Sequence, residues 1–202
     1  EPEVTFTLQT GPTTWHTDKS RDQIRALRAA RPDAEPLRPN SRLNGLTSWT
    51  LVLGVDVRVA ATPINPPRAG SAPTEYCARL IAADVKFGIL RMDAYVTRDY
   101  RPGTCPHRVV RDHEGRHVAI YRAAVERFAP LIESKLRATA RELPPVRAAD
   151  AKAGAERLRK TLHDDLSRIF DAMSRETETE NRALDTAEAY EAERNLCPRG
   201  AW

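Results

Sequence analysis

The sequence predicts an α+β fold, with a small, mainly antiparallel sheet in the N-terminal half and a long antiparallel helical hairpin in the C-terminal half. Within 46–60, apolar residues occupy every second position from Trp49 to Val59, which is typical of a half-buried strand. Apolar residues recur every three or four positions after residue 106 and again after residue 150, which indicates two long helices. The Pro144-Pro145 pair separates the two patterns and predicts a turn between them.

We expect a single domain over residues 1–202, strand-rich with one helix over 1–100 and hairpin-forming over 104–196. The 202 residues are 41% hydrophobic, which is enough to bury a core. Because 32 basic and 28 acidic residues nearly balance, we expect an ordinary solvated surface and no nucleic-acid partner. No run of eighteen apolar residues occurs, so we expect no transmembrane segment.

The first hundred residues contain the predicted sheet and one helix. Residues 3–8 alternate as a short strand does, and the stretches 76–87 and 89–97 carry β-type residues in a similar pattern. Between them, Ser20 can cap a helix that Pro32 would end. Together with 46–60, these segments suggest a small, mainly antiparallel sheet of three or four strands.

The first long helix is expected to start at Pro106, since proline suits a first helical position, with Thr104 or Cys105 as the cap. Pro130 should kink or end it. Asp150 can start the second helix. That helix has an apolar stripe made of Leu158, Leu162, Leu166, Ile169, Phe170 and Met173. Beyond Met173 the same face becomes polar and acidic.

His113, Glu114 and His117 form an H-E-x-x-H motif within the first long helix. Residues four apart share one face of a helix, so the two histidines can hold one metal ion between them. Both fall on the apolar side of the helix, whereas most arginines fall off it. Core-edge histidines bonded to backbone or carboxylates are the alternative, and the second histidine with an intervening glutamate favours a metal site.

A third ligand is expected from the acidic end of the second helix. A catalytic zinc ion takes three protein ligands and keeps one open position. If the two helices pack antiparallel, His113 and His117 face roughly residues 177–189. That segment offers Asp185, Glu188 and Glu180 as candidates.

Three cysteines allow one internal disulfide at most. None forms a C-x-x-C pair, so a thiolate zinc site is not expected. The hairpin brings Cys197 near Cys105, and a bond between them would clamp the open end of the hairpin. Cys77 pairing with Cys105 is the rival, and three free thiols in a reduced compartment are a further alternative.

Two stretches resemble a group of uncharacterised secreted bacterial proteins that are predicted zinc-dependent, zincin-like peptidases. The first is the run from 94 to 105 (A-Y-V-T-R-D-Y-R-P-G-T-C) with the H-E-x-x-H motif, and the second is the run from 181 to 190 (N-R-A-L-D-T-A-E-A-Y) with Cys197. The resemblance covers residues 74–197. It implies export to the periplasm or beyond, a zinc ion, and peptidase chemistry on a peptide or protein substrate.

In that chemistry, His113 and His117 bind Zn²⁺ and Glu114 serves as the general base. The resemblance favours Asp185 as the third ligand, whereas helical phase favours Glu188. Tyr190 and Tyr121 are within reach of an oxyanion, although packing is the expected role of each. These two tyrosines therefore remain secondary candidates.

Two other functions compete with the peptidase. One is a metal-binding protein that does not hydrolyse its partner, and the other is a helical-hairpin interaction module without metal. For a peptidase, the strand through Tyr95 and Val96 offers an edge on which an extended peptide can add as a further strand.

Overall fold

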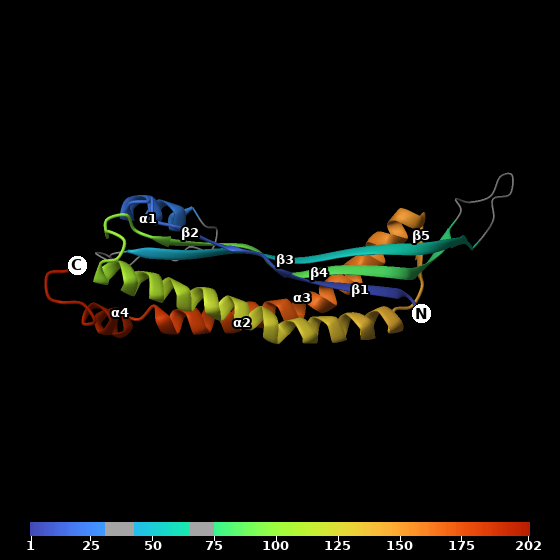
Figure 1. Ribbon diagram of the computed structural model, residues 1–202. Helices are drawn as coiled ribbons and strands as arrows, with labels where there is room; N and C mark the ends of the chain where they lie inside the picture. Colours follow the sequence, from blue (N-terminus) through green and yellow to red (C-terminus); the bar gives the residue numbers. More distant parts are fainter. Residues whose placement is uncertain (31–42, 65–74) are drawn as a thin grey trace. The chain divides into compact units, whose positions relative to one another are not determined.

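The computed structural model describes residues 1–30, 43–64 and 75–202 (Figure 1). Pro32, the predicted end of the first helix, lies outside these residues. The described elements, in chain order, are β1 (Glu3–Thr10), β2 (Thr13–His16), α1 (Arg21–Ala29), β3 (Gly45–Pro63), β4 (Tyr76–Val96), α2 (Cys105–Glu142), β5 (Val146–Ala148), α3 (Ala151–Leu184) and α4 (Ala187–Arg194).

The prediction of a small, mainly antiparallel sheet is wrong. The sheet has five strands, and β1 and β2 both run parallel to β4. β2 lies in register with Met92–Tyr95 of β4, so that Thr13 is opposite Met92 and His16 is opposite Tyr95. Alternation of apolar and polar residues shows which face of a strand is buried, but it carries no information on the direction of the pairing.

The predicted strand pair 76–87 and 89–97 is one continuous strand, β4, which pairs with every other strand of the sheet. Gly88 does not end it, although its φ is +131°. A Cβ at Gly88 would lie 2.2 Å from the Gln9 carbonyl oxygen, so glycine allows β1 to approach closely.

The predicted simple helical hairpin is also wrong. A strand, β5, follows α2 and pairs antiparallel with the start of β4, so that Tyr76 is opposite Ala148. The helical run then breaks after Leu184, and Thr186 caps a separate helix, α4, by accepting a hydrogen bond from Ala189 N–H at 3.1 Å. Pro130 lies inside α2 and does not end it.

The described chain divides into two compact units. The first comprises Glu1–Gln9, Leu51–Gly88 and Val125–Ser174. Its core is centred on Phe87, which stacks on Phe6 and meets Phe170 edge-on. Fully buried helix residues of this unit are Ile132, Leu136, Leu158, Leu162, Leu166 and Met173. The last four belong to the predicted apolar stripe.

The second unit comprises Thr10–Thr50, Ile89–Ala124 and Arg175–Trp202, apart from residues that are not described. Its core includes Ile24, Met92 and Val96. Helix α1 begins with a capping box in which Ser20 and Gln23 bond each other's backbone N–H. This unit contains the whole H-E-x-x-H motif.

The edge of β4 at Tyr95 is not free, contrary to the prediction that it could receive a peptide. Tyr95 is paired with His16 of β2, and the Thr97 N–H donates to the Asn44 carbonyl just before β3. Across the described residues, no helix is both long and apolar enough to span a membrane, as the hydropathy of the sequence predicts.

Candidate metal centre

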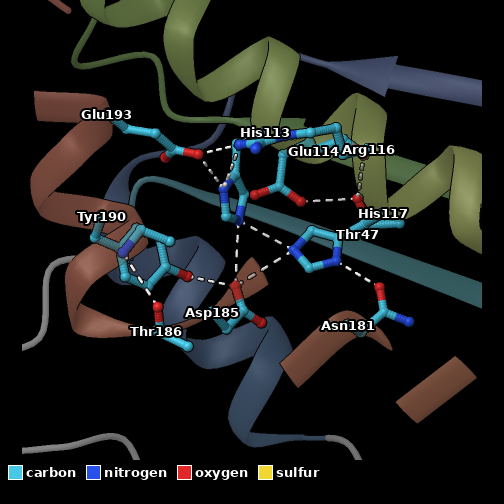
Figure 2. Close-up of polar contacts among 11 residues, drawn as sticks. Thr47, His113, Glu114, Arg116, His117, Asn181, Asp185, Thr186, Tyr190 and Glu193 are labelled. Atoms are coloured by element: carbon cyan, nitrogen blue, oxygen red, sulfur yellow. Dashed lines mark hydrogen bonds and ion pairs between the residues drawn. The ribbon is translucent and has the colours of Figure 1, made fainter. Parts of the chain in front are cut away.

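His113 and His117 lie side by side on α2, and the Nε2 atoms of the two rings point toward each other (Figure 2). Both residues are buried. Their Nε2 atoms are 3.0 Å apart, as the one-turn spacing of residues i and i+4 allows. The two histidines therefore form a chelating pair on the inward face of the helix.

Asp185 supplies a third donor atom at the break between α3 and α4. Its Oδ1 lies 3.2 Å from His113 Nε2 and 3.3 Å from His117 Nε2. A tetrahedral ion with ligand bonds of about 2.0–2.2 Å holds its ligand atoms about 3.3–3.5 Å apart. The three atoms thus form a triangle close to one face of a zinc coordination tetrahedron.

Each imidazole has an acceptor on its other nitrogen. His117 Nδ1 donates to Asn181 Oδ1 at 2.5 Å, and His113 Nδ1 donates to Glu193 Oε1 at 3.0 Å. The orientation of the Asn181 amide follows from its Nδ2, which donates to the Thr177 carbonyl at 2.7 Å. With Nδ1 protonated, both Nε2 lone pairs face the Asp185 carboxylate. Three acceptors that converge in this way require protons or a cation between them.

The charges of the metal-free centre agree with that requirement. Burial lowers the pKa of His113, but the bond to Asp185, the Glu114 charge and Glu193 outweigh burial and raise the pKa to about 9. Burial also lowers the pKa of His117, but the bond to Asp185, the charges of Glu114 and Asp185 and the bond to Asn181 outweigh burial and raise it. Burial would raise the pKa of Asp185, but bonds from both histidines hold it well below its usual range. Protons thus fill the centre when no metal is bound.

Glu114 lies beside the histidines without joining the ligand triangle. It is buried, and its Oε2 accepts a hydrogen bond of 2.7 Å from Thr47 Oγ1 on β3. Burial raises the pKa of Glu114, while the charges of His117 and His113 oppose that rise. A raised pKa in a buried carboxylate next to a metal site is typical of a general base.

Gly45 leaves the space that the Glu114 side chain occupies. A Cβ at Gly45 would lie 2.3 Å from Glu114 Oε1 and 2.8 Å from its Cγ and Cδ. We expect Gly45→Ala to displace this carboxylate and to lower the free energy of unfolding by about 1–3 kcal/mol. Gly115→Ala is the matched control within the motif, because a Cβ there meets nothing within 4 Å.

Chemical denaturation of both variants tests this expectation. Gly115→Ala should raise stability by about 0.5–1 kcal/mol, because alanine is the better helix former. Equal stability of Gly45→Ala and the unaltered protein would show that the Glu114 side chain does not need this space.

Tyr190 of α4 lies beside His113 and Asp185. Its ring stacks on His113 with centroids 5.2 Å apart, and its hydroxyl donates to Asp185 Oδ1 at 2.5 Å. Burial and the Asp185 charge raise the pKa of Tyr190, so its phenol stays protonated. Tyr121 has a different role, since it is buried and stacks on Trp49 at 3.8 Å.

A disulfide joins Cys105 and Cys197, and Cys77 is free. The bond connects the first residue of α2 to the segment that follows α4. The rival pairing of Cys77 with Cys105 is therefore excluded in this structure.

The structure separates the candidates for the third ligand. Among the described residues, His113, His117 and Asp185 form the cluster of potential metal ligands, with atoms within 4.8 Å of one another. Glu188 is exposed on α4, and Glu180 lies on α3; neither belongs to the cluster. Asp185 was the first choice and Glu188 the next, and the break at 185–186 explains why helical phase favoured Glu188: a regular helix does not continue through Asp185.

Four contributors were missed in the sequence: Gly45, Thr47, Asn181 and Glu193. Asn181 had a usable signal, because it lies one helical turn before Asp185 on the same face. Thr47 lies in the predicted strand 46–60 and Gly45 directly precedes it, but alternation does not say which helix that strand faces. No local pattern marks Glu193.

Comparison of this chain with protein family models, with curated proteins and with solved structures found no match. The resemblance of residues 74–197 to secreted zinc peptidases therefore stays a prediction.

Proposed function

We propose that this protein is a zinc-dependent metallopeptidase, with His113, His117 and Asp185 as ligands and Glu114 as the general base. The observation that carries the proposal is the convergence of three donor atoms, 3.0–3.3 Å apart, with an acceptor on each distal imidazole nitrogen. This combination of ligands and outer partners is characteristic of protein zinc sites.

The exposed side of the centre supports a catalytic rather than a structural ion. Structural zinc sites are closed by four protein ligands, whereas catalytic sites keep one open position. The cluster has three donor residues in the described chain, and the Asp185 side chain is 47% exposed. A substrate can therefore approach from the side where Asp185 and Tyr190 lie.

The bound zinc would act as a Lewis acid on the scissile carbonyl and lower the pKa of the attacking water. Glu114 takes the proton from that water and returns it to the leaving amine. Thr47 orients the carboxylate through its bond to Oε2, and the raised pKa of Glu114 makes it a stronger base than an exposed glutamate. Asn181 and Glu193 hold the imidazoles in the tautomer that ligates metal.

One feature supports a substrate outside the cytoplasm. The Cys105–Cys197 disulfide suits an exported protein, because such bonds persist in oxidising compartments.

Paired alanine variants of Asp185 and Glu188 test the metal centre. Asp185→Ala should weaken zinc binding by more than the roughly 10–100-fold that outer partners of a metal ligand contribute, because it removes a ligand itself. Glu188→Ala should bind zinc as the unaltered protein does, since Glu188 is exposed and lies outside the cluster. Competition titration against a chromophoric chelator measures both.

The same titration, followed by incubation with a peptide library, separates binding from hydrolysis. Zinc that restores cleavage to metal-stripped protein supports the proposal. Equal zinc affinity in Asp185→Ala and the unaltered protein would contradict the ligand assignment, and a zinc-loaded protein that cleaves nothing would contradict the peptidase assignment.

A further inference from the structure

Helix α4 contributes side chains to the candidate metal centre although it is short. It has eight residues, and none of them is buried. A helix of this length is marginal in isolation, because the hydrogen bonds of about two turns do not offset the free-energy cost of helix nucleation. Even so, α4 supplies Glu193 to His113 and Tyr190 to Asp185.

The contacts that hold α4 in place are mainly polar or covalent. Glu193 forms an ion pair with Arg116 of α2. Three residues beyond the helix, Cys197 is buried and bonded to Cys105 at the start of α2. Farther on, the Trp202 indole N–H donates to the Arg194 carbonyl, and its ring packs edge-on against Tyr100.

Among these contacts, the disulfide is the one that a reductant can break and an oxidant can re-form. It ties the end of α4 to the helix that carries both histidines, eight residues before His113. Without it, the eight-residue helix depends on Trp202, on the stack of Tyr190 on His113, and on polar contacts such as that with Arg116, which is 49% exposed. Ion pairs with a solvent-exposed partner stabilise a fold only weakly.

We propose that the Cys105–Cys197 disulfide is a redox switch of the metal centre, and that its reduction by a dithiol releases α4 and weakens metal binding. This inference rests on the proposed function. Glu193 then acts as a positioning residue: it orients His113 through Nδ1, and only while the disulfide keeps α4 docked. His117 and Asn181 lie on α2 and α3, so the reduced centre keeps part of its affinity.

The exchange follows ordinary thiol–disulfide chemistry. Cys105 is half-buried and Cys197 is buried, so a thiolate of the dithiol attacks Sγ of Cys105 and the sulfur of Cys197 leaves as a thiolate that takes up a proton. The second thiol of the reductant then attacks the mixed disulfide and releases Cys105. In total, the protein gains two electrons and two protons, and the dithiol becomes a disulfide.

The reverse exchange with a disulfide donor re-forms the bond and completes the centre. The chain would therefore bind metal tightly only after it is oxidised. Outer partners of a ligating histidine typically contribute 10–100-fold to metal affinity, so we expect a loss of that size on reduction.

The test compares zinc affinity with and without the bond, in a background where Cys77→Ser removes the free thiol. The variant Cys105→Ser with Cys197→Ser mimics the reduced state and offers no thiolate that could itself bind zinc. Competition titration with zinc alone should show a Kd about 10–100-fold weaker than that of the disulfide-bonded protein. Kd values within about twofold would overturn the inference.

Glu193→Ala in the disulfide-bonded protein keeps the inference testable if the serine variant folds poorly, and the same substitution in the serine background tests the coupling. With the bond intact, this substitution should weaken zinc binding by a similar factor. In the serine background it should have no further effect, because α4 is already released. Additive losses, or an unchanged affinity of Glu193→Ala in the oxidised protein, would overturn it.

The result also separates the two proposals. Tight and equal zinc binding with and without the disulfide would support the proposed metal centre and contradict the redox switch. An oxidised protein that binds no zinc would contradict the proposed metal centre itself.

Discussion

Glu114→Gln should reduce peptide hydrolysis by about 10²–10⁴-fold while the protein keeps its zinc, because the amide cannot accept the proton of the attacking water. The substitution preserves the shape of the side chain and the oxygen that accepts from Thr47. Burial already disfavours the charged form of Glu114, so a neutral amide should not lower the melting temperature. Initial rates on a cleaved peptide, metal content and thermal melting give the three readouts.

Asp112→Asn is the matched control, since Asp112 is an exposed carboxylate two residues earlier on the same helix. Its rate should equal that of the unaltered protein. If Glu114→Gln cleaves peptides at the unaltered rate, Glu114 is not the base. If Glu114→Gln loses its zinc, the substitution has disturbed the ligands and the roles assigned here are wrong.

The helix that holds His113, Glu114 and His117 could be predicted from the sequence because the relevant spacing is local. His113, Glu114 and His117 lie within one turn, and an α-helix puts residues i and i+4 on one face regardless of its surroundings. Asp185 could be proposed from a similar pattern. The apolar stripe of the second helix becomes polar after Met173, and such a change shows where the inward face of a helix stops packing against a core.

The sheet and the outer partners of the site were not predictable in this way. β1 and β2 pair in parallel with a strand that lies about eighty residues later, and nothing in their alternation records direction. Glu193 reaches His113 only because the chain breaks after Leu184 and restarts at Thr186. The role of Gly45 follows only from the structure, in which the absence of a side chain leaves space for Glu114.

Zinc affinity should rise steeply with pH, because the metal must displace the protons that occupy the free centre. The pKa of His113 is raised to about 9, so between about pH 6 and 8 this residue is protonated in the metal-free protein and must lose its proton to bind zinc. One displaced proton changes the affinity about tenfold per pH unit. We therefore expect at least about a 100-fold gain from pH 6 to 8, and more if His117, whose pKa is also raised, releases a second proton.

The stability of the metal-free protein should follow the opposite trend. A histidine whose pKa is higher in the folded chain stabilises the fold fully below its ordinary pKa of about 6.5 and loses that contribution as the pH rises through about 9. Calorimetric titrations in buffers of different ionisation enthalpy count the protons released by zinc, and thermal melts without metal follow stability.

His163→Gln is the matched control for these titrations, because His163 lies partly exposed on α3, outside the cluster. It should release as many protons as the unaltered protein. Zinc binding that releases no proton, with an affinity that stays level across this pH range, would mean that the imidazoles already present free lone pairs. The convergence of His113, His117 and Asp185 would then have to be held by packing and by Asn181 and Glu193 alone, without the protons or cation that three facing acceptors otherwise require.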